Sequence, residues 1–290
     1  MECIDSVRNQ SYTNWELILI DDGSTDNTIE IINSLSDSRV RLICAQHGGV
    51  SVARNLGLKQ RTGDFCLFLD SDDTLEFYAL KNISDFIKEY PDVEIIKFGY
   101  KTKERNFSAS KEFCLSSSDF FKQGGLPTRT VWSNAYRSSL FDDIAFSPGI
   151  RVAEDTEVSI RCYFATRYLG QLTDVLYNYR TDEQSVMNSP VDIEKVRDHL
   201  RVINKLQQTV KPLDSIQEEA FSASIELLKI SFFHALYHLP SSKSVSKLIS
   251  EYRALPSKGK PKTRALRFAE FSYKAYFFFL KYVRKVKQKT

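Results

Sequence analysis

The chain has 290 residues, of which 42% are hydrophobic and 27% charged. This composition excludes wholesale disorder, and the length allows one large domain or a core domain with an appendage. The net charge of +3 hides an asymmetry, because residues 257–290 contain eleven Lys and Arg and one acid, a charge of +10 that leaves −7 for the rest. An acidic body with a basic tail indicates a tail that meets something anionic.

Cysteine usage and the start of the chain favour a reduced, cytoplasmic setting. The five cysteines are scattered, odd in number and without metal-ligand spacing, so we expect free thiols. Met1 is followed by Glu2, Asp5 and Arg8, which is not the basic and then apolar pattern of a signal peptide. The sequence has no run of eighteen apolar residues, so nothing in it clearly spans a membrane.

Strands and helices alternate in the first hundred residues. The chain opens in the pattern of a helix end, and apolar runs, cap residues and the stop at Pro91 define the later elements. Strands are predicted at residues 15–20, 39–45, 65–69 and 94–100, and helices at 2–8, 29–35, 50–60 and 75–90. This order predicts an α/β fold with a mostly parallel sheet flanked by crossover helices.

Beyond residue 100 the pattern loosens. We predict an antiparallel hairpin region at 101–118, a helix at about 154–165 and a strand at 175–180. After Pro190 the sequence pattern is that of helices. Helices are predicted at residues 191–210, 215–239, 242–255 and 263–285. A domain boundary is therefore expected near residue 188, with residues 1–188 (halves 1–100 and 101–188) on one side and a helical region, 189–290, on the other.

The most informative stretch runs from Phe65 to Asp73 and reads FCLFLDSDD. Asp70, Asp72 and Asp73 follow the apolar run where a strand leaves a parallel sheet, the edge at which open α/β folds bind ligands. Like charges about 4 Å apart repel by roughly 4 kcal/mol at an effective dielectric near 20. The cluster implies a cation, a cationic ligand or raised pKa values, and a divalent ion that also holds a phosphate meets this need. The alternative interpretation of this cluster is that its acids only cap the start of a helix.

Three further motifs allow both a functional and a structural interpretation. Asp21-Asp22-Gly23 ends a predicted strand, where it either contacts a nucleobase or ribose or forms a capped turn. Glu154-Asp155 opens a helix, where acids either complement the macrodipole or supply a general base. Arg54 in Ala53-Arg54-Asn55 either pairs with phosphate or is a solvated surface side chain.

The order of these motifs resembles family 2 glycosyltransferases of the bacterial surface-polysaccharide type. The resemblance covers roughly residues 2–188 and rests on segments that occur in the family's order. These segments are IDSV (4–7), NQSY (9–12), WELILIDDGSTD (15–26), ARN (53–55), LDSDD (69–73), VWSNAYR (131–137), ED (154–155) and LYNYR (176–180).

The resemblance implies a GT-A fold and transfer of a sugar, with inversion, from a nucleotide-diphosphate donor such as a UDP-sugar, with Mg²⁺ or Mn²⁺ as cofactor. The acceptor would be a glycan or lipid-linked saccharide in the synthesis of capsule, lipopolysaccharide or a similar surface polysaccharide. It further implies that Asp155 is the general base with Glu154 beside it, and that Asp72 coordinates the metal. The residues it places at the donor are Asp22 (nucleobase or nearby ribose), Arg54, Asn55 and Asp70 (ribose and metal-bound water).

One departure from the family concerns the start of the chain. Members normally begin with an apolar strand and a Pro-x-Tyr-Asn type turn, whereas Met1 lies inside the helix that comes next. That strand is central in the family's sheet, and its end contributes donor-binding residues. We therefore expect the reading frame to begin upstream, with a truncated product as the alternative.

Two other functions are compatible with the sequence. LFLDSDDTL (67–75) also resembles the strand and Asp-x-Asp-x-Thr motif of haloacid-dehalogenase-like phosphatases, in which Asp70 would be the nucleophile and Asp72 the acid. Asp73 stands where that family usually has Gly, which argues against this interpretation. The second is a catalytically impaired GT-A module that binds without turnover.

Residues 263–290 interleave aromatic and basic side chains. Such a helix suits the interface of an anionic membrane, and we expect peripheral contact with the inner face of the cell membrane, or else a helix that packs on the body. Nucleic acid is not an expected partner, because the body is acidic and no base-reading motif is present.

Overall fold

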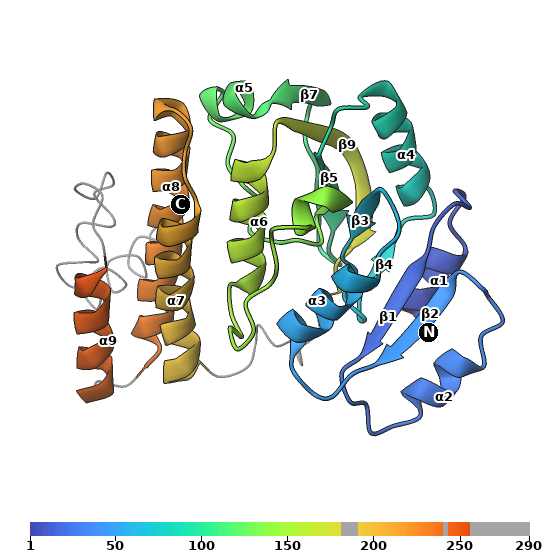
Figure 1. Cartoon of the computed structure of the whole chain (residues 1–290), viewed down its shortest axis with the longest axis horizontal. Helices are drawn as coiled ribbons and strands as arrows, with labels where there is room; N and C mark the ends of the chain where they lie inside the picture. Colours follow the sequence, from blue (N-terminus) through green and yellow to red (C-terminus); the bar gives the residue numbers. More distant parts are fainter. Residues whose placement is uncertain (181–190, 240–242, 256–290) are drawn as a thin grey trace. The chain divides into compact units, whose positions relative to one another are not determined.

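The computed structural model describes residues 1–180, 191–239 and 243–255 (Figure 1). The chain divides into two compact units, Met1–Met187 and Asn188–Thr290. The predicted helix at 263–285 and the expected membrane-facing tail lie outside the described residues. None of the helices in the described ranges has the length and hydrophobicity that crossing a membrane requires.

The first unit opens with a helix and a βαβ element. Helix α1 (Glu2–Arg8) precedes strand β1 (Leu17–Asp21), and α2 (Thr28–Asn33) leads to β2 (Val40–Cys44), which pairs with β1 in parallel. Helix α3 (Val50–Gln60) comes next and contacts β1. These elements lie within a few residues of the predicted ranges, because each has its own apolar period and end signals.

A second, seven-stranded sheet forms the centre of the unit. Its strands in spatial order are β3 (Phe65–Leu67), β8 (Asn134–Arg137), β5 (Ile95–Lys101), β9 (Tyr168–Asn178) and β4 (Thr74–Leu75), with β6 (Asn106–Phe107) beside β5 and β7 (Phe113–Ser116) beside β9. The expectation of a mostly parallel sheet needs correction here. Only β5 and β9 pair in parallel in this sheet, because β8 returns between β3 and β5 and the other short strands pair antiparallel to a neighbour.

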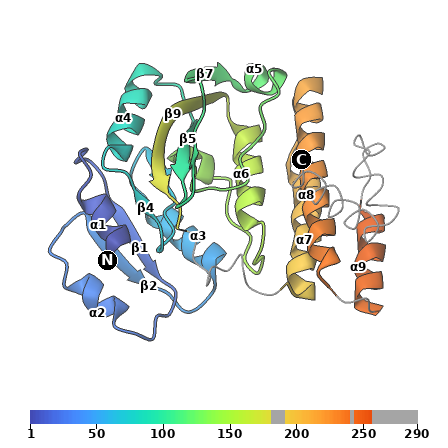
Figure 2. The ribbon, with the colours of Figure 1, turned by 180° about the vertical axis from the view of Figure 1, so that it is seen from behind.

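Helices lie on both sides of this sheet. Figures 1 and 2 show α4 (Ala79–Glu89) and α6 (Glu154–Ala165) on opposite sides of β5 and β9, with α5 (Ser117–Lys122) near β7. The helix predicted at 75–90 begins later than expected. Thr74 and Leu75 instead pair with Asn178 and Tyr177, because their backbone groups complete the edge of β9.

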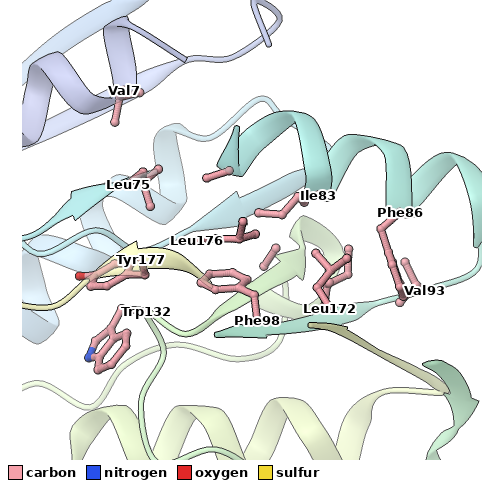
Figure 3. Packing of buried hydrophobic residues seen from close by; sticks show 13 residues of the cluster. Val7, Leu75, Ile83, Phe86, Val93, Phe98, Trp132, Leu172, Leu176 and Tyr177 are labelled. Carbon is pink, nitrogen blue, oxygen red and sulfur yellow. The ribbon is translucent and has the colours of Figure 1, made fainter. Parts of the chain in front are cut away.

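The core of the first unit lies between α4 and the sheet (Figure 3). Ile83 and Phe86 point from the helix toward the strands and belong to one buried cluster with Leu172 and Leu176. At the other end of the cluster the ring of Trp132 stacks on that of Tyr177, with ring centroids 4.7 Å apart. Burial of a tyrosine requires a partner for its hydroxyl, and that of Tyr177 donates to the acidic loop, residues 70–73.

The second unit is helical where it is described. It contains α7 (Ile193–Thr209), α8 (Ser215–Tyr237) and α9 (Lys243–Ala254), with α7 in contact with both others. Asp192 and Asp214 cap the first two helices by accepting hydrogen bonds from backbone N–H groups three residues on. The unit has its own cluster of buried apolar side chains, which includes Phe232 and Tyr252.

Two glycines give a test of this packing. A Cβ at Gly99 would lie 2.7 Å from the carbonyl oxygen of Phe107 and 2.9 Å from that of Asp174, whereas at Gly57 it would lie 3.6 Å from Ile20 Cγ1. We expect Gly99→Ala to lower the free energy of unfolding by about 2 kcal/mol, because backbone atoms cannot yield. Gly57→Ala, inside α3, should raise it by about 0.5–1 kcal/mol. Urea unfolding measures both, and equal effects would contradict the described strand pairing.

Candidate active site

One guanidinium joins three of the predicted motifs. Arg54 donates from Nη2 to Asp70 Oδ1 at 2.9 Å, and from Nη1 to Glu154 Oε1 at 3.3 Å and to the Asp155 carboxylate. Its Cζ lies 5.3 Å from the ring centroid of Phe146. Asp70 and Asp155 thereby meet at the side chain of Arg54, although they lie 16 and 101 positions away from it in the sequence.

The backbone before α6 aims the two acids at Arg54. Ala153 has φ 66°, in the left-handed region, and no other residue except glycine has a positive φ within the described ranges. This conformation costs an L-residue roughly 1–2 kcal/mol, so it persists only where its surroundings enforce it. Glu154 and Asp155 come directly after it in the first turn of α6, where the helix macrodipole also favours acids.

The cluster carries more negative than positive charge. With all groups ionised, Arg54 faces Asp70, Glu154 and Asp155, a net charge of −2. Arg54, Glu154 and Asp155 are 12%, 14% and 17% exposed. Burial therefore raises the pKa of both Glu154 and Asp155, while the Arg54 guanidinium opposes the rise. A site of this kind favours the binding of a proton or a cation.

Asp22 lies in a separate loop. Its two carboxylate oxygens accept hydrogen bonds from the backbone N–H groups of Gly48 and Gly49, both at 2.8 Å. Asp21 instead caps the turn at Gly23 and Ser24. The described contacts of Asp22 thus tie the end of β1 to the loop before α3, and they do not include the Arg54 cluster.

Asn55 holds a loop. Its Nδ2 donates to the carbonyl of Phe146 at 2.9 Å, and its Oδ1 accepts from the N–H of Phe146 at 2.8 Å. The residue after Phe146, Ser147, donates from Oγ to the fully buried Glu157 at 2.6 Å. Arg161 donates to the same carboxylate. The segment ahead of α6 is therefore fastened from both α3 and α6.

Asp72 is the open member of the acidic loop. It is exposed, and no hydrogen bond or ion pair to it is present among the described residues. The described part of the chain contains no group of three or more His, Cys, Asp or Glu side chains arranged to hold a metal ion. A single open carboxylate nevertheless fits Mg²⁺ or Mn²⁺ shared with a substrate, because Mg²⁺ usually takes one or two carboxylates plus phosphate oxygens.

Asp73 has a structural role. It is 1% exposed and is not a helix cap, since α4 begins at Ala79. Its carboxylate accepts from the Tyr177 hydroxyl and from the Arg180 N–H, both at 2.6 Å. The same hydroxyl accepts from the Asp70 N–H at 3.3 Å. Tyr177 and Asp73 therefore clamp the acidic loop to the end of β9.

Sequence reasoning assigned no role to Tyr177 or Glu157, and it left that of Asp73 open. Tyr177 and Tyr179 lie two positions apart in the predicted strand, a spacing that puts both rings on one face. No local signal distinguishes the buried Asp73 from the exposed Asp72, because the difference arises from contacts 104 and 107 residues away.

The clamp can be tested with Tyr177→Phe. The change removes a donor from buried Asp73 and an acceptor from the Asp70 N–H, so we expect the free energy of unfolding to fall by about 1–3 kcal/mol. Tyr78→Phe, at a side chain that is 60% exposed, is the matched control and should change stability by less than about 0.5 kcal/mol. Equal denaturation midpoints for the two variants in urea would refute the clamp.

Comparison with known proteins identifies the family. Residues 1–145, half of the chain, match the sequence model of glycosyl transferase family 2. The match confirms the resemblance predicted from the motifs and argues against the phosphatase interpretation.

Several curated relatives carry glycosyltransferase names. Glycosyltransferase GlyG of Streptococcus pneumoniae serotype 4 is 28% identical over 228 residues, which cover 71% of this chain and 74% of GlyG. Poly(ribitol-phosphate) beta-N-acetylglucosaminyltransferase TarS of Staphylococcus aureus is 30% identical over 214 residues, which cover 67% of this chain and 36% of TarS. The chain thus spans most of the first relative and about a third of the second.

Solved structures share the fold. The crystal structure of S. aureus TarS 1–349 in complex with UDP-GlcNAc superposes with a TM-score of 0.64 at 21% identity, and covers 95% of this chain and 84% of that one. At this identity the likeness establishes the GT-A fold alone. With the family match, it follows that this chain belongs to glycosyl transferase family 2 and is a glycosyltransferase.

Proposed function

We propose that the protein is an inverting glycosyltransferase that moves a sugar from a UDP-sugar to a glycan or lipid-linked saccharide acceptor. The observation that carries the proposal is the contact of Arg54 with Asp70, Glu154 and Asp155. This contact brings an acidic pair on α6 to the strand end that carries the acidic loop, where a base and a donor would have to meet.

The order of the motifs and the ligands of related structures support our proposal for the donor side. Asp22 holds the nucleobase or nearby ribose, Asp70 contacts the ribose, and Arg54 and Asn55 lie beside the donor. TarS has been solved with UDP-GlcNAc and with UDP, and a mannosyltransferase of Pyrobaculum calidifontis with GDP-Man and Mn²⁺. Those ligands support a nucleotide sugar as the donor class.

A divalent ion fits this arrangement. Asp72 would hold Mg²⁺ or Mn²⁺ together with the donor diphosphate, and the ion would supply Lewis-acid stabilisation of the leaving group. Asp70, in the same loop, would orient water on that ion while its carboxylate stays paired with Arg54. The clamp formed by Asp73 and Tyr177 would keep both aspartates in place.

The chemical step depends on the acidic pair. Asp155 accepts the proton of the acceptor hydroxyl while the hydroxyl oxygen attacks the anomeric carbon in line with the departing diphosphate. A base with a raised pKa holds that proton better near neutral pH, and Glu154 supports it from the same turn. Arg54 keeps enough ionised Asp155 present for the reaction to begin.

The two halves of the domain predicted at residues 1–188 would divide the substrates between them. Residues 1–100 would bind the nucleotide sugar and residues 101–188 the acceptor, in the synthesis of capsule, lipopolysaccharide or a related surface polysaccharide. Curated relatives such as TarS, named for transfer to poly(ribitol-phosphate), support a surface-polymer acceptor. Residues 263–290 would contact the inner face of the cell membrane.

Replacing Asp155 tests the base. Asp155→Asn removes the proton acceptor, so we expect sugar transfer and donor hydrolysis to fall by roughly 10²–10⁴-fold. UDP binding with Mn²⁺, measured by calorimetry, should be retained, because the substitution leaves the acidic loop intact.

Asp143→Asn, at an exposed carboxylate ahead of α6, is the control and should keep full activity. Undiminished turnover by Asp155→Asn would disprove the base assignment. UDP binding by the unmodified chain without turnover of any UDP-sugar would instead favour the binding-module alternative.

The pH dependence provides a second test. Because the pKa of Asp155 is raised, kcat/KM should fall on acidification with a midpoint above about 3.9, the usual value for Asp. Arg54→Gln removes the charge that favours ionised Asp155, so the midpoint should move to higher pH by about one unit or more. Arg41→Gln, at a pair with Glu16 outside the site, should leave it in place. A midpoint unchanged or lowered in Arg54→Gln would contradict the assignment.

A further inference from the structure

The first turn of α6 is held by more than its contacts with Arg54. Residues 128–134, a loop and the first residue of β8, lie against this helix. Three α6 side chains at positions i, i+3 and i+7, on one side of the helix, form hydrogen bonds with the 128–134 segment. They are Thr156, Ser159 and Tyr163. None of the three is more than 4% exposed. The proposed base, Asp155, therefore lies next to a buried, hydrogen-bonded contact.

The 128–134 segment is fixed to α6 at several points. Thr156 Oγ1 donates to the Arg129 carbonyl at 2.9 Å, and the Tyr163 hydroxyl donates to Asn134 Oδ1 at 2.9 Å. Within the segment, Asn134 Nδ2 donates to Thr128 Oγ1 at 2.8 Å. Movement of the segment away from the helix would leave these buried groups unpaired, which is costly.

The same segment connects α6 to the central sheet. Asn134 begins β8, β8 pairs with β3, and β3 leads into the acidic loop that carries Asp70. A hydrogen-bonded path thus runs from the first turn of α6 to the acidic loop. Arg54 joins the same two parts through ion pairs. The position of Asp155 relative to Asp70 therefore has two supports, and Thr156 anchors the second of them beside the base.

The segment also brings a donor to the base. Burial raises the pKa of Asp155, and the Arg54 guanidinium and the backbone N–H of Val131 oppose the rise. Val131 is fully buried and belongs to the 128–134 segment, whereas Arg54 belongs to α3. The charged and titratable groups that face Asp155 from α3, the acidic loop, its own turn and β8 are Arg54, Asp70, Glu154 and Tyr136.

We propose that Thr156 is a positioning residue for Asp155. Its hydroxyl holds the Arg129 carbonyl and thereby keeps the Val131 N–H against the Asp155 carboxylate. The inference rests on the proposed function, in which Asp155 is the base. Thr156 does not touch the substrate in this assignment, but a shift of about 1 Å in a reacting group can slow a reaction roughly 10²-fold.

The test measures the pKa of Asp155 by ¹³C NMR of the aspartate carboxyl groups in the full chain, without substrate. The Asp155 signal is the one that Asp155→Asn removes. Thr156→Val keeps the side-chain shape and removes the hydroxyl. The pKa should then rise by about half a unit or more, because loss of a donor disfavours the charged carboxylate. Thr156→Ser keeps the hydroxyl and should leave the pKa within about 0.2 units.

Thr166→Val is the matched control. Thr166 is also 4% exposed, and its Oγ1 donates to Glu94 at 3.0 Å at the other end of α6. The change removes a buried hydroxyl of the same kind. It should lower the urea midpoint as Thr156→Val does, and it should leave the pKa of Asp155 where it is.

Turnover is the second readout, with the UDP-sugar that the unmodified chain converts fastest. Thr156→Val should lower kcat about fivefold or more and change the donor KM less than about twofold, because it leaves the donor residues intact. If Thr156→Val does not fold, Tyr163→Phe, which removes the donor to Asn134, takes its place under the same criteria.

An unchanged or lowered pKa in Thr156→Val would overturn the proposal, and so would an equal rise in Thr156→Ser or Thr166→Val. Undiminished kcat in Thr156→Val, with Asp155→Asn inactive, would overturn it as well. If the pKa moves as expected but Asp155→Asn keeps full turnover, the proposed function fails while the positioning of Asp155 by Thr156 stands.

Discussion

A single guanidinium shared by three carboxylates is the interaction on which the rest of the site depends. Arg54 brings together α3, the loop that carries Asp70 and the first turn of α6. Removal of one member of a buried charged group leaves the others uncompensated, at a cost of about 3–5 kcal/mol. The surplus of negative charge also supports the proposed chemistry, because a site that is short of positive charge stabilises an added proton on Asp155.

A second anchor holds the acidic loop from the other side. The Tyr177 hydroxyl links Asp73 to the N–H of Asp70, and Trp132 covers the tyrosine ring. With both ends of the loop secured, Asp72 is left exposed between them. The three neighbouring acids therefore have different roles: one is paired, one is buried and structural, and one is open to a ligand.

The fold could be predicted from the sequence where elements have their own period and end signals, as in the alternation up to residue 100. Strands β4 and β8 could not, because two to four residues show no period and their pairing is decided by β9 and β5. The candidate residues could be identified as separate motifs and by resemblance. Their convergence on Arg54 could not, since no spacing rule relates residues 101 positions apart.

The contact between Asp73 and Arg180 has an evolutionary consequence. Asp73 accepts from the backbone N–H of Arg180, and this hydrogen bond does not require a particular side chain at position 180. Mutations at this position could change the charge or size of the surface beside the acidic loop while this hydrogen bond is kept. Related enzymes could in this way diversify the molecules they accept while they conserve the geometry of the reaction itself.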